Sequence, residues 1–576
     1  MNRTFRSNSE QVAFIRNRKI TTILSVFIIF IFVIIVRLFY LQINQNKKFS
    51  LLGEKNFLRT EMLPSRRGNL LDCHGNLLAT NSPVFDLYWK GTGKKRFSEN
   101  QFAVVKKVSD ALQTEIDTKK IMSVERYSKR FLLKKNIDFE ELCCVSEQCA
   151  DSKNLFVEKH FKRVYPYDSL ASHIVGYLGR IDCAALVGRS GLERFFESKL
   201  HGESGYISHI TNAKGKKIIQ TDLKDAKAGD DIQLTLDLDL QYLCEGLFKP
   251  DQSGVIVLMD PETGAVRACV SHPNFDPNLF LDTISIKDWN EQFSKNSPFL
   301  NRVINATYPP ASIFKLVTFI TGLEEGVISP ETFFNCRGHT LFCGRKHNCI
   351  RRWGHGKLSA EMALAKSCNI PCYEIAQKIS VDHFAQYAYS LGLGMKTGFL
   401  FEEKAGIVPS TRWKQAYKGE RWWSGETLHV SIGQSYLLVT PLQVARMISG
   451  LCMGYLVKPR ILESENTEID KLYISEPTMT FIRDTMGMVV QKGTARILNK
   501  HKDLRIFAKT GTAQTVSLKK QKESKEQLEH AWFGSYFYDK NNKPLTLIVL
   551  VEHAGRAYHA VKIADDFLTA YQKRFT

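Results

Sequence analysis

The longest apolar stretch of the chain lies near its N-terminus. Ile20 to Val36 contains no charged residue, and apolar residues continue after Arg37 as LFYLQI. Together they are long enough to cross a bilayer as one helix. A secretory signal peptide is the alternative, but its apolar core is usually shorter, and no A-x-A-like cleavage pattern follows this one. We therefore predict one uncleaved transmembrane anchor over residues 20–43.

Basic residues flank the predicted anchor. Five lie within residues 1–19, and Lys47 and Lys48 follow on the other side. Because Lys and Arg close to a span favour the cytoplasmic side, we predict a cytoplasmic tail at residues 1–19. The chain from about residue 44 onward then lies outside the cytoplasm, and it is long enough for two or more domains.

The segment after the anchor has short apolar runs broken by turn signals, which indicates a mixed α/β structure. A polar loop covers residues 224–231. The run DIQLTLDLDLQYL then alternates apolar and polar residues like a strand before it changes to helical spacing. We place a domain boundary at this loop, with one domain at residues 44–230 and a second at residues 231–576.

The second domain has strand patterns at both of its ends. Residues 253–271 predict a β-hairpin whose turn is Asp260 to Gly264. HAWFGSYFY (530–538) and PLTLIVLVEH (544–553) predict two more strands near the C-terminus. We expect one antiparallel sheet built from both ends with helices between them, so the fold class is α+β.

The net charge of the chain limits which partners fit it. The formal net charge of +20 could suggest nucleic acid, but the predicted location argues against it. Anionic lipid headgroups or an anionic wall polymer fit better, and a merely solvated charged surface is about equally plausible.

Thirteen cysteines are an odd number, so at least one thiol is unpaired in the monomer. Cys143 and Cys144 could each bridge Cys149, and we leave these three unassigned.

A candidate nucleophile follows two prolines, Pro309 and Pro310, which predict a helix start. Ser312 and Lys315 then lie three residues apart on one face of the first turn. A serine hydroxyl needs a base to become a nucleophile, and a buried lysine beside another cation has the lowered pKa that such a base requires. The helix N-terminus also favours developing negative charge there. Alone, this S-x-x-K spacing is weak evidence, because it occurs by chance on many helices.

Two further motifs follow in the chain. Ser367-Cys-Asn369 lies in a central helical region, and Lys509-Thr-Gly-Thr512 follows the strand-like run LRIFA. Taken alone, the K-T-G segment is typical of an ordinary edge strand with a turn. The order S-x-x-K, S-x-N, K-T-G is that of the active-site serine enzymes that react with penicillin. The three motifs together are therefore a strong signal.

With these motifs the sequence resembles the class B penicillin-binding proteins, the membrane-anchored D,D-transpeptidases of peptidoglycan synthesis. The resemblance covers nearly the whole chain. The segments that carry it, besides the three motifs, are RGNLLDCHGNLLA (67–79), RVYPYDSLASHIVGYLGR (163–180), GRSGLERFFESKLHGESG (188–205), LTLDLDLQ (234–241), SIGQSYLLVTPLQVA (431–445) and KTGTAQ (509–514). The departures are small: the usual P-P-G-S-T-F-K reads PPASIFK here, and Cys73 stands where an Arg is common.

The resemblance implies a single transmembrane helix, an elongated pedestal (dimerisation-like) domain at residues 44–230 and a transpeptidase domain at residues 231–576. It also implies residue roles. Ser312 would attack the penultimate D-Ala carbonyl of a stem peptide and hold an acyl-enzyme until an amine of a neighbouring stem accepts it. Lys315 would be the base for acylation, within a proton and hydrogen-bond network that includes Ser367, Asn369 and Lys509.

Further roles implied by the resemblance concern the strand that carries the K-T-G motif. Thr510 and Thr512, with Lys509, would bind the terminal carboxylate of the substrate. The backbone N–H groups of Ser312 and Thr512 would form the oxyanion hole. Gly511 would let the strand approach the substrate closely.

Several activities share these motifs. A β-lactamase is usually a compact exported domain, whereas a predicted anchor and a preceding domain favour a tethered biosynthetic enzyme. A D,D-carboxypeptidase differs only in using water as acceptor, and no residue forbids that. A catalytically silent wall-synthesis scaffold is a remote alternative, because every catalytic position is filled. Within class B, a division-specific (septal) enzyme is the alternative to an elongation enzyme.

Trp353-Gly-His355-Gly followed by S-C-N resembles the elongation type, penicillin-binding protein 2, some of whose members carry a metal site beside the active site. The matching ligands would be Cys336, Cys349, His355 and Cys368. Three thiolates and one imidazole suit a closed, structural, tetrahedral Zn²⁺ site. Cys343, His339 and His347 are nearby substitutes for the fourth ligand. The alternatives are a Cys336–Cys349 or Cys343–Cys349 disulfide, with Cys368 as a small buried side chain.

The same resemblance implies a location and partners. The protein would be a single-pass protein of the cell inner membrane, with its catalytic domain in the periplasm. Its partners would be stem peptides that end in D-Ala-D-Ala, a polytopic glycosyltransferase of the shape, elongation, division and sporulation (SEDS) family, and elongation scaffold proteins. β-Lactams would inhibit it, and no organic cofactor or nucleic acid is implied.

Overall fold

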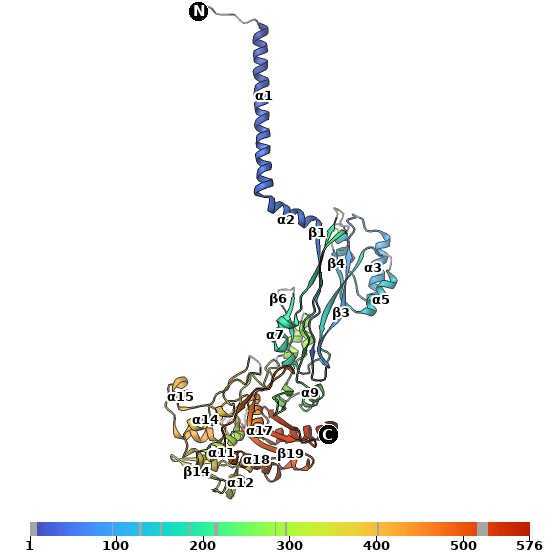
Figure 1. Ribbon diagram of the computed structural model, residues 1–576. Helices are drawn as coiled ribbons and strands as arrows, with labels where there is room; N and C mark the ends of the chain where they lie inside the picture. Colours follow the sequence, from blue (N-terminus) through green and yellow to red (C-terminus); the bar gives the residue numbers. More distant parts are fainter. Residues whose placement is uncertain are drawn as a thin grey trace, which may run out of the picture. The chain divides into compact units, whose positions relative to one another are not determined.

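The computed structural model describes residues 8–94, 96–125, 130–149, 152–181, 185–211, 217–282, 284–293, 296–399, 402–514 and 528–575 (Figure 1). The chain forms two compact units. The first contains residues 1–65 and 203–227, and the second contains residues 66–202 and 228–576. The boundaries predicted at residues 43/44 and 230/231 do not coincide with this division, because residues 203–227 return to pair with the segment that follows the anchor.

The first unit begins with helix α1 (Asn8–Phe39). Its apolar part is exposed and belongs to a 29-residue span, Arg16–Asn44, within which an 18-residue stretch reaches a mean hydropathy of 2.9. By length and composition, this is the one helix among the described residues that could cross a membrane. The predicted anchor at residues 20–43 lies within it, and Arg3 and Arg6 of the predicted tail lie outside the described residues.

The rest of the first unit is a π-helical turn (Tyr40–Asn44), helix α2 (Asn46–Phe57) and a three-stranded antiparallel sheet in the order β1-β8-β9. Its strands are β1 (Leu58–Leu63), β8 (Gly205–Thr211) and β9 (Lys217–Lys224). Leu58 pairs with Ile210 and Leu63 with Gly205, so β1 and β8 are aligned over their whole length.

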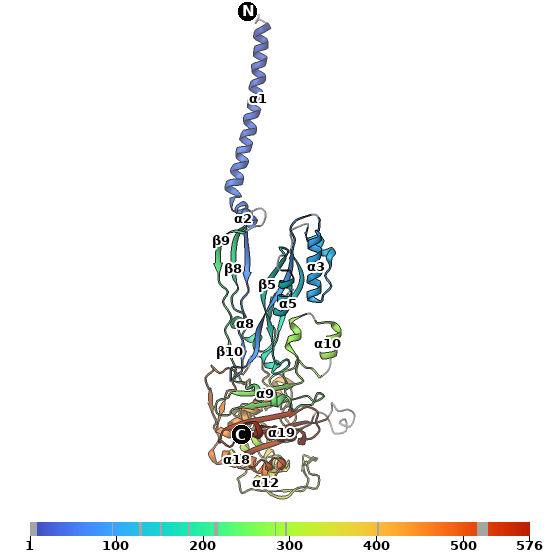
Figure 2. The ribbon, with the colours of Figure 1, turned by 90° about the vertical axis from the view of Figure 1, so that its right-hand side faces the viewer.

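The second unit starts with a sheet around the long strand β3 (Leu77–Lys90), which pairs antiparallel with β4 (Arg130–Ile137) and β5 (Leu155–Val164). Short strands β2 (Leu70–Leu71) and β10 (Ile232–Gln233) extend it. Helices α3 (Glu99–Leu112) and α5 (Phe139–Gln148) both begin with a capping box and pack their apolar residues on this sheet (Figure 2). The mixed α/β prediction for this segment is confirmed.

Small elements complete this part of the second unit. They are α4 (Thr118–Glu125), α6 (Ser172–Val175), β6 (Leu178–Ile181), β7 (Ala185–Gly188), α7 (Gly191–Phe195) and α8 (Glu197–Leu200).

A buried ion-pair cluster joins three of the segments that carry the family resemblance. The Glu193 carboxylate accepts hydrogen bonds from Arg67 Nε at 2.7 Å and from Arg163 Nε at 2.8 Å, and it has no exposed surface. Arg163 also donates to the Gly68 carbonyl at 2.7 Å. Arg67 also donates to the partly exposed Glu197 carboxylate at 2.6 Å. Two carboxylates therefore balance two buried guanidinium groups from distant parts of the chain, and each member depends on the others.

The other five-stranded sheet of the second unit is antiparallel, in the order β12-β11-β21-β20-β19. Its strands are β11 (Gly254–Met259), β12 (Val266–His272), β19 (Arg505–Ala513), β20 (His530–Tyr538) and β21 (Pro544–Val551). The predicted hairpin at residues 253–271 is confirmed, as is the single sheet made from both ends of the domain. The order brings the K-T-G strand β19 to one edge.

Side chains of this sheet alternate between two apolar cores. Val255 and Val257 face the core that includes helices α11 and α17, whereas Ile256 and Leu258 face the core that includes α9 and α19. Because β11 is buried on both faces, its sequence is continuously apolar rather than alternating. The helices of both cores are α9 (Leu238–Glu245), α11 (Lys315–Glu324), α17 (Pro441–Met453), α18 (Glu476–Gln491) and α19 (Tyr558–Phe575).

The remaining elements lie between β12 and β19 in the chain. They are 3-10 turns at Pro277–Leu281, Ala311–Ile313 and Arg496–Lys500, helices α10 (Ile286–Phe293), α12 (Ala360–Ala365), α13 (Ile370–Ala376), α14 (Val381–Ser390), α15 (Thr411–Lys418) and α16 (Ser424–Ser431), and strands β13 (Phe333–Cys336), β14 (His339–Phe342), β15 (Arg345–Asn348), β16 (Gly356–Ser359), β17 (Tyr455–Val457) and β18 (Ile469–Lys471).

The strand expected in DIQLTLDLDLQYL is much shorter than its alternation predicts. Only Ile232–Gln233 is a strand, and α9 begins after Asp237, whose side chain accepts a hydrogen bond from the Leu240 N–H at 3.1 Å. Leu234 and Leu236 between them are buried, and Leu234 forms a single bridge to Leu462. Thr235 between them is buried too, and its N–H donates to the Ile461 carbonyl at 2.7 Å. The segment is therefore extended and buried on both sides, and it pairs with the chain near Leu462 through isolated contacts rather than through a regular strand.

Candidate active site and cysteine cluster

The candidate nucleophile lies in a tight turn before α11. Ser312 is in the 3-10 turn Ala311–Ile313, and Lys315 is the first residue of α11, so the predicted helix start is confirmed. Ala311 has a positive φ of 50°, a conformation that favours glycine, and this is the position where the family usually has Gly. The Ala311 N–H donates to the Gly433 carbonyl at 2.9 Å. The turn is thus fixed by the segment that contains Gly433.

Lys315 is buried and its ammonium group has three acceptors. Nζ donates to Asn369 Oδ1 at 2.7 Å, to the Ser367 carbonyl at 2.7 Å and to Ser367 Oγ at 3.2 Å. Lys509 Nζ, also buried, donates to the same Ser367 Oγ at 3.0 Å. The three motifs, almost 200 residues apart at their extremes, therefore meet around one serine hydroxyl.

Ser367 adopts a left-handed backbone conformation with a φ of 54°. This conformation is unfavourable for a residue with a Cβ, by about 1–3 kcal/mol. It turns both the carbonyl and the hydroxyl of Ser367 toward Lys315. Because both lysines donate to its Oγ, the hydroxyl proton of Ser367 is free to be donated to a third group.

Burial lowers the pKa of both lysine amines. It lowers the pKa of Lys315 below its ordinary value. Burial and then the nearby charge of Lys315 lower the pKa of Lys509 much further. Two amines that share one acceptor in a low-dielectric site do not both stay charged easily, which favours a neutral amine that can accept a proton.

Ser312 opens onto a cleft of about 680 Å³. Ser312 is half-buried, and its hydroxyl has no hydrogen-bond partner among the described residues. The cleft also receives residues of the other two motifs: Ser367, Asn369, Thr510, Gly511 and Thr512. All the predicted catalytic and substrate-binding positions therefore line this cleft, except Lys315 and Lys509, which lie beneath Ser367.

The K-T-G strand makes a close approach to the nucleophile turn. A Cβ atom on Gly511 would lie 3.2 Å from the Pro310 carbonyl oxygen and 3.1 Å from the Trp532 Cβ. Glycine is thus the residue that fits between the strand and the turn. Thr510 Oγ1 lies 2.6 Å from Thr494 Oγ1, a partner that the sequence motifs do not identify.

A cluster of three cysteines and one histidine lies next to the Ser367 segment. The Sγ atoms of Cys336, Cys349 and Cys368 and a ring nitrogen of His355 all lie within 4.8 Å of one another. Cys336 is the last residue of β13, and Cys368 lies between Ser367 and Asn369. Cys343, by contrast, is exposed in the turn between β14 and β15.

The distances in this cluster fit a tetrahedral ion. Zn²⁺ with Zn–S of about 2.3 Å and Zn–N of about 2.0 Å separates two sulfurs by about 3.8 Å and a sulfur from a nitrogen by about 3.5 Å. The Cys349 and Cys368 sulfurs are 3.7 Å apart, and His355 Nδ1 lies 3.5 Å from both Cys336 Sγ and Cys349 Sγ. The residues therefore fit the ion that the resemblance implies.

The sulfur positions can also be compared with the alternative prediction, a disulfide from Cys349 to Cys336 or Cys343. A disulfide requires sulfurs about 2.05 Å apart, and all twelve cysteines among the described residues are free, including Cys143, Cys144 and Cys149. A hydrogen bond from the Cys368 thiol lowers the pKa of Cys349. A thiolate is the form that binds a metal.

The comparisons with known proteins agree with this geometry. The profile of the penicillin-binding protein dimerisation domain matches residues 62–234, and that of the penicillin-binding protein transpeptidase domain matches residues 254–570. The chain belongs to the penicillin-binding protein transpeptidase family. A relative of this penicillin-binding protein, the peptidoglycan D,D-transpeptidase MrdA of Acinetobacter baumannii, is 31% identical and covers 95% of this chain and 87% of its own.

Two solved structures are similar over most of this penicillin-binding protein. One, from a peptidoglycan synthase complex that coordinates polymerization and crosslinking, is 28% identical with a TM-score of 0.75, and it covers 97% of this chain and 99% of its own. The other, penicillin-binding protein PBP2 of Helicobacter pylori in complex with MreC, has a TM-score of 0.76. At 24% identity, over 90% of this chain and 99% of its own, it supports the fold.

Proposed function

We propose that this penicillin-binding protein is a peptidoglycan D,D-transpeptidase that cross-links stem peptides during cell-wall elongation. The observation that carries the proposal is that the three motifs surround one cleft, with two buried lysines beneath a shared serine hydroxyl. The name of the Acinetobacter relative, a peptidoglycan D,D-transpeptidase, supports it.

In the proposed reaction, Ser312 Oγ attacks the carbonyl carbon of the penultimate D-Ala as its proton passes to the neutral amine of Lys315. The tetrahedral intermediate is held by the N–H groups of Ser312 and Thr512, where stabilisation of developing charge is largest. When it collapses, the terminal D-Ala leaves as an amine that takes up a proton, and an acyl ester remains on Ser312. An amine of a second stem then attacks the carbonyl carbon of this ester. The amide cross-link forms, the bond to Ser312 Oγ breaks, and the free serine hydroxyl is restored.

The other residues keep this machinery in place. Asn369 and Ser367 accept hydrogen bonds from Lys315 and orient it. Lys509 shares the Ser367 hydroxyl and passes protons through it. Thr510 and Thr512 bind the terminal carboxylate at the β19 edge of the cleft, and Gly511 lets this strand lie close to the turn that carries Ser312.

We further propose that Cys336, Cys349, His355 and Cys368 hold one structural Zn²⁺, with no position left for a water ligand. The bound ion would supply a rigid link rather than chemistry. Because Cys368 lies inside the Ser367-Cys-Asn369 motif, the link would hold the acceptors of Lys315 in place.

The proposal includes a location and partners. The Arg16–Asn44 helix would anchor the protein in the inner membrane, with the N-terminus in the cytoplasm and the catalytic domain in the periplasm. The peptidoglycan synthase complex among the similar structures supports a glycan polymerase as partner. An elongation scaffold protein is proposed as a second partner, by analogy with the Helicobacter complex.

The test follows cross-linking directly. The purified full-length protein is supplied with nascent glycan strands that carry D-Ala-D-Ala stems, and the products are separated after glycan digestion. We expect cross-linked dimers with one D-Ala released per cross-link, and none with Ser312→Ala. Release of D-Ala without dimers would instead indicate a carboxypeptidase, and no turnover of the strands would refute the proposed activity.

A further inference from the structure

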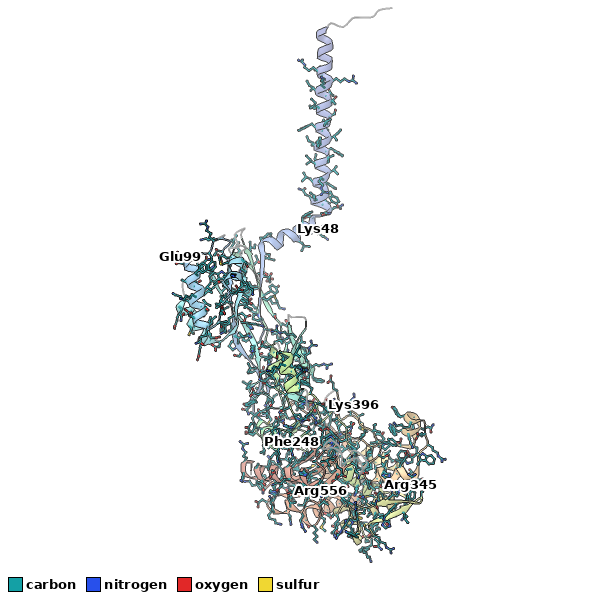
Figure 3. The ribbon with its side chains drawn as sticks, turned by 180° about the vertical axis from the view of Figure 1, so that it is seen from behind. Lys48, Glu99, Phe248, Arg345, Lys396 and Arg556 are labelled. Atoms are coloured by element: carbon teal, nitrogen blue, oxygen red, sulfur yellow. The ribbon has the colours of Figure 1, made fainter. Side chains whose placement is uncertain are left out.

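The segment that holds three of the four cluster residues is strongly basic. Between residues 332 and 360 the chain has no Asp or Glu, and it has six Lys and Arg residues: Arg337, Arg345, Lys346, Arg351, Arg352 and Lys357. We call residues 336–357 the basic insertion. Its hairpin β14–β15 includes Arg345, which is labelled in Figure 3.

Two of these cations line the catalytic cleft. Lys346 and Arg352 line the same cleft as Ser312 and the residues Thr510 to Thr512. Glu529 is the single acidic residue among the described residues of the lining. Neither Lys346 nor Arg352 forms an ion pair with a carboxylate in the described part of the chain. Their charges are therefore available to a ligand in the cleft.

Both cations have defined positions. Lys346 pairs with Leu341 in the β14–β15 ladder. The backbone of Arg352 is pressed against Gly338, because a Cβ atom on Gly338 would lie 2.0 Å from the Arg352 carbonyl oxygen. Gly338 has a φ of 89°, so glycine is required there on both counts. The backbones that carry both exposed side chains are thus fixed next to the cleft.

We propose that Lys346 and Arg352 form a carboxylate-binding subsite that recognises an acidic stem peptide, one with free carboxylates upstream of its terminal D-Ala-D-Ala. The terminal carboxylate is assigned to Thr510 and Thr512, so an upstream carboxylate is the group left for these cations. A guanidinium binds a carboxylate through two parallel hydrogen bonds, which gives specificity as well as attraction. This inference rests on the proposed function.

The test compares two stems that differ only in charge. Full-length protein is assayed for cross-linking with strands whose upstream carboxylates are free and with strands in which they are amidated. The wild type should prefer the acidic stem by about 10-fold in kcat/KM, the size of one lost charge-assisted hydrogen bond. Lys346→Gln with Arg352→Gln should abolish that preference and leave the amidated stem unchanged.

Matched controls separate a subsite from general attraction. Arg345→Gln with Arg351→Gln removes the same two charges from the basic insertion, at positions that are not among the described residues of the cleft lining. This control should keep the preference for the acidic stem, and Arg352→Lys should keep part of it. Acylation by a penicillin, which has no upstream peptide, should stay within about twofold of wild type in all variants.

Two results would overturn the subsite. One is equal turnover of acidic and amidated stems by the wild type. The other is an equal loss of preference in the control pair, which would show long-range steering by net charge. Failure of the proposed function would give a different result: neither stem would be cross-linked, although penicillin would still acylate Ser312. That result would overturn the proposed function and the subsite together.

Discussion

Cys368 provides the sharpest test of how the cysteine cluster supports catalysis. Its neighbours Ser367 and Asn369 supply all three acceptors of Lys315, at 2.7, 3.2 and 2.7 Å. Cys368→Ala removes one of the four proposed ligands. If the segment then moves by about 1 Å, a 2.7 Å contact lengthens beyond hydrogen-bond range, and misplacement of that size lowers rates by about 100-fold.

The assay measures the second-order rate constant for acylation by a fluorescent penicillin, together with zinc per protein. We expect about one zinc in the wild type, little in Cys368→Ala, and acylation about 100-fold slower. Cys244→Ala is the matched control, because Cys244 is also fully buried but lies in the core with α9 and α19. It should lose similar thermal stability from the deleted thiol and keep its zinc and its acylation rate.

Two outcomes would refute this reasoning. If Cys368→Ala were acylated at the wild-type rate, the cluster would not position the catalytic segment. If the wild type contained no zinc after purification without chelators, and stayed fully active in a chelator, the thiols would be buried side chains without a metal.

Three other perturbations test separate parts of the structure. Lys509→Met should slow acylation by about 100-fold or more without lowering the melting temperature, because it replaces a buried amine, which is costly to desolvate, with an apolar side chain of similar length; a parallel drop in both would indicate a structural lysine. Glu193→Ala should lower the free energy of unfolding by about 3–5 kcal/mol in denaturant titrations, since Arg163 loses the carboxylate that it contacts and Arg67 keeps only the partly exposed Glu197; a change below about 1 kcal/mol would contradict that cluster. Burial raises the pKa of Glu245 from 4.5 to about 7, so between these pH values the folded state keeps a proton that the unfolded state has lost, and stability falls as pH rises through the window. The melting temperature of Glu245→Gln relative to wild type should therefore increase from about pH 5 to about pH 8, and a constant difference would show that Glu245 does not titrate there.

Sequence patterns predicted the features that depend on local periodicity. The hairpin at residues 253–271 and the strands near the C-terminus were recognisable because their apolar runs are bounded by turn residues. The S-x-x-K, S-x-N and K-T-G motifs were recognisable because their spacing is fixed by one turn or one strand. Apolar spacing also predicted the N-terminal helix, although not its extension back to Asn8.

Features that depend on distant contacts were not predictable from one sequence. No pattern links Glu193 to Arg67 and Arg163, because the cluster forms only after three segments fold together. The left-handed backbone of Ser367, whose hydroxyl accepts hydrogen bonds from two lysines distant in the chain, has no local signal in the sequence. Spacing also left Cys343 as a substitute for Cys336, and it is the pairing of β13 with β16 that brings Cys336 to His355.

The most direct test of the account is to locate the acyl group. Full-length protein is incubated with a penicillin, and the intact protein and its proteolytic peptides are analysed by mass spectrometry. We expect one penicilloyl group per chain, on Ser312, and none on Ser312→Ala. An adduct on another residue, or equal labelling of Ser312→Ala, would contradict it.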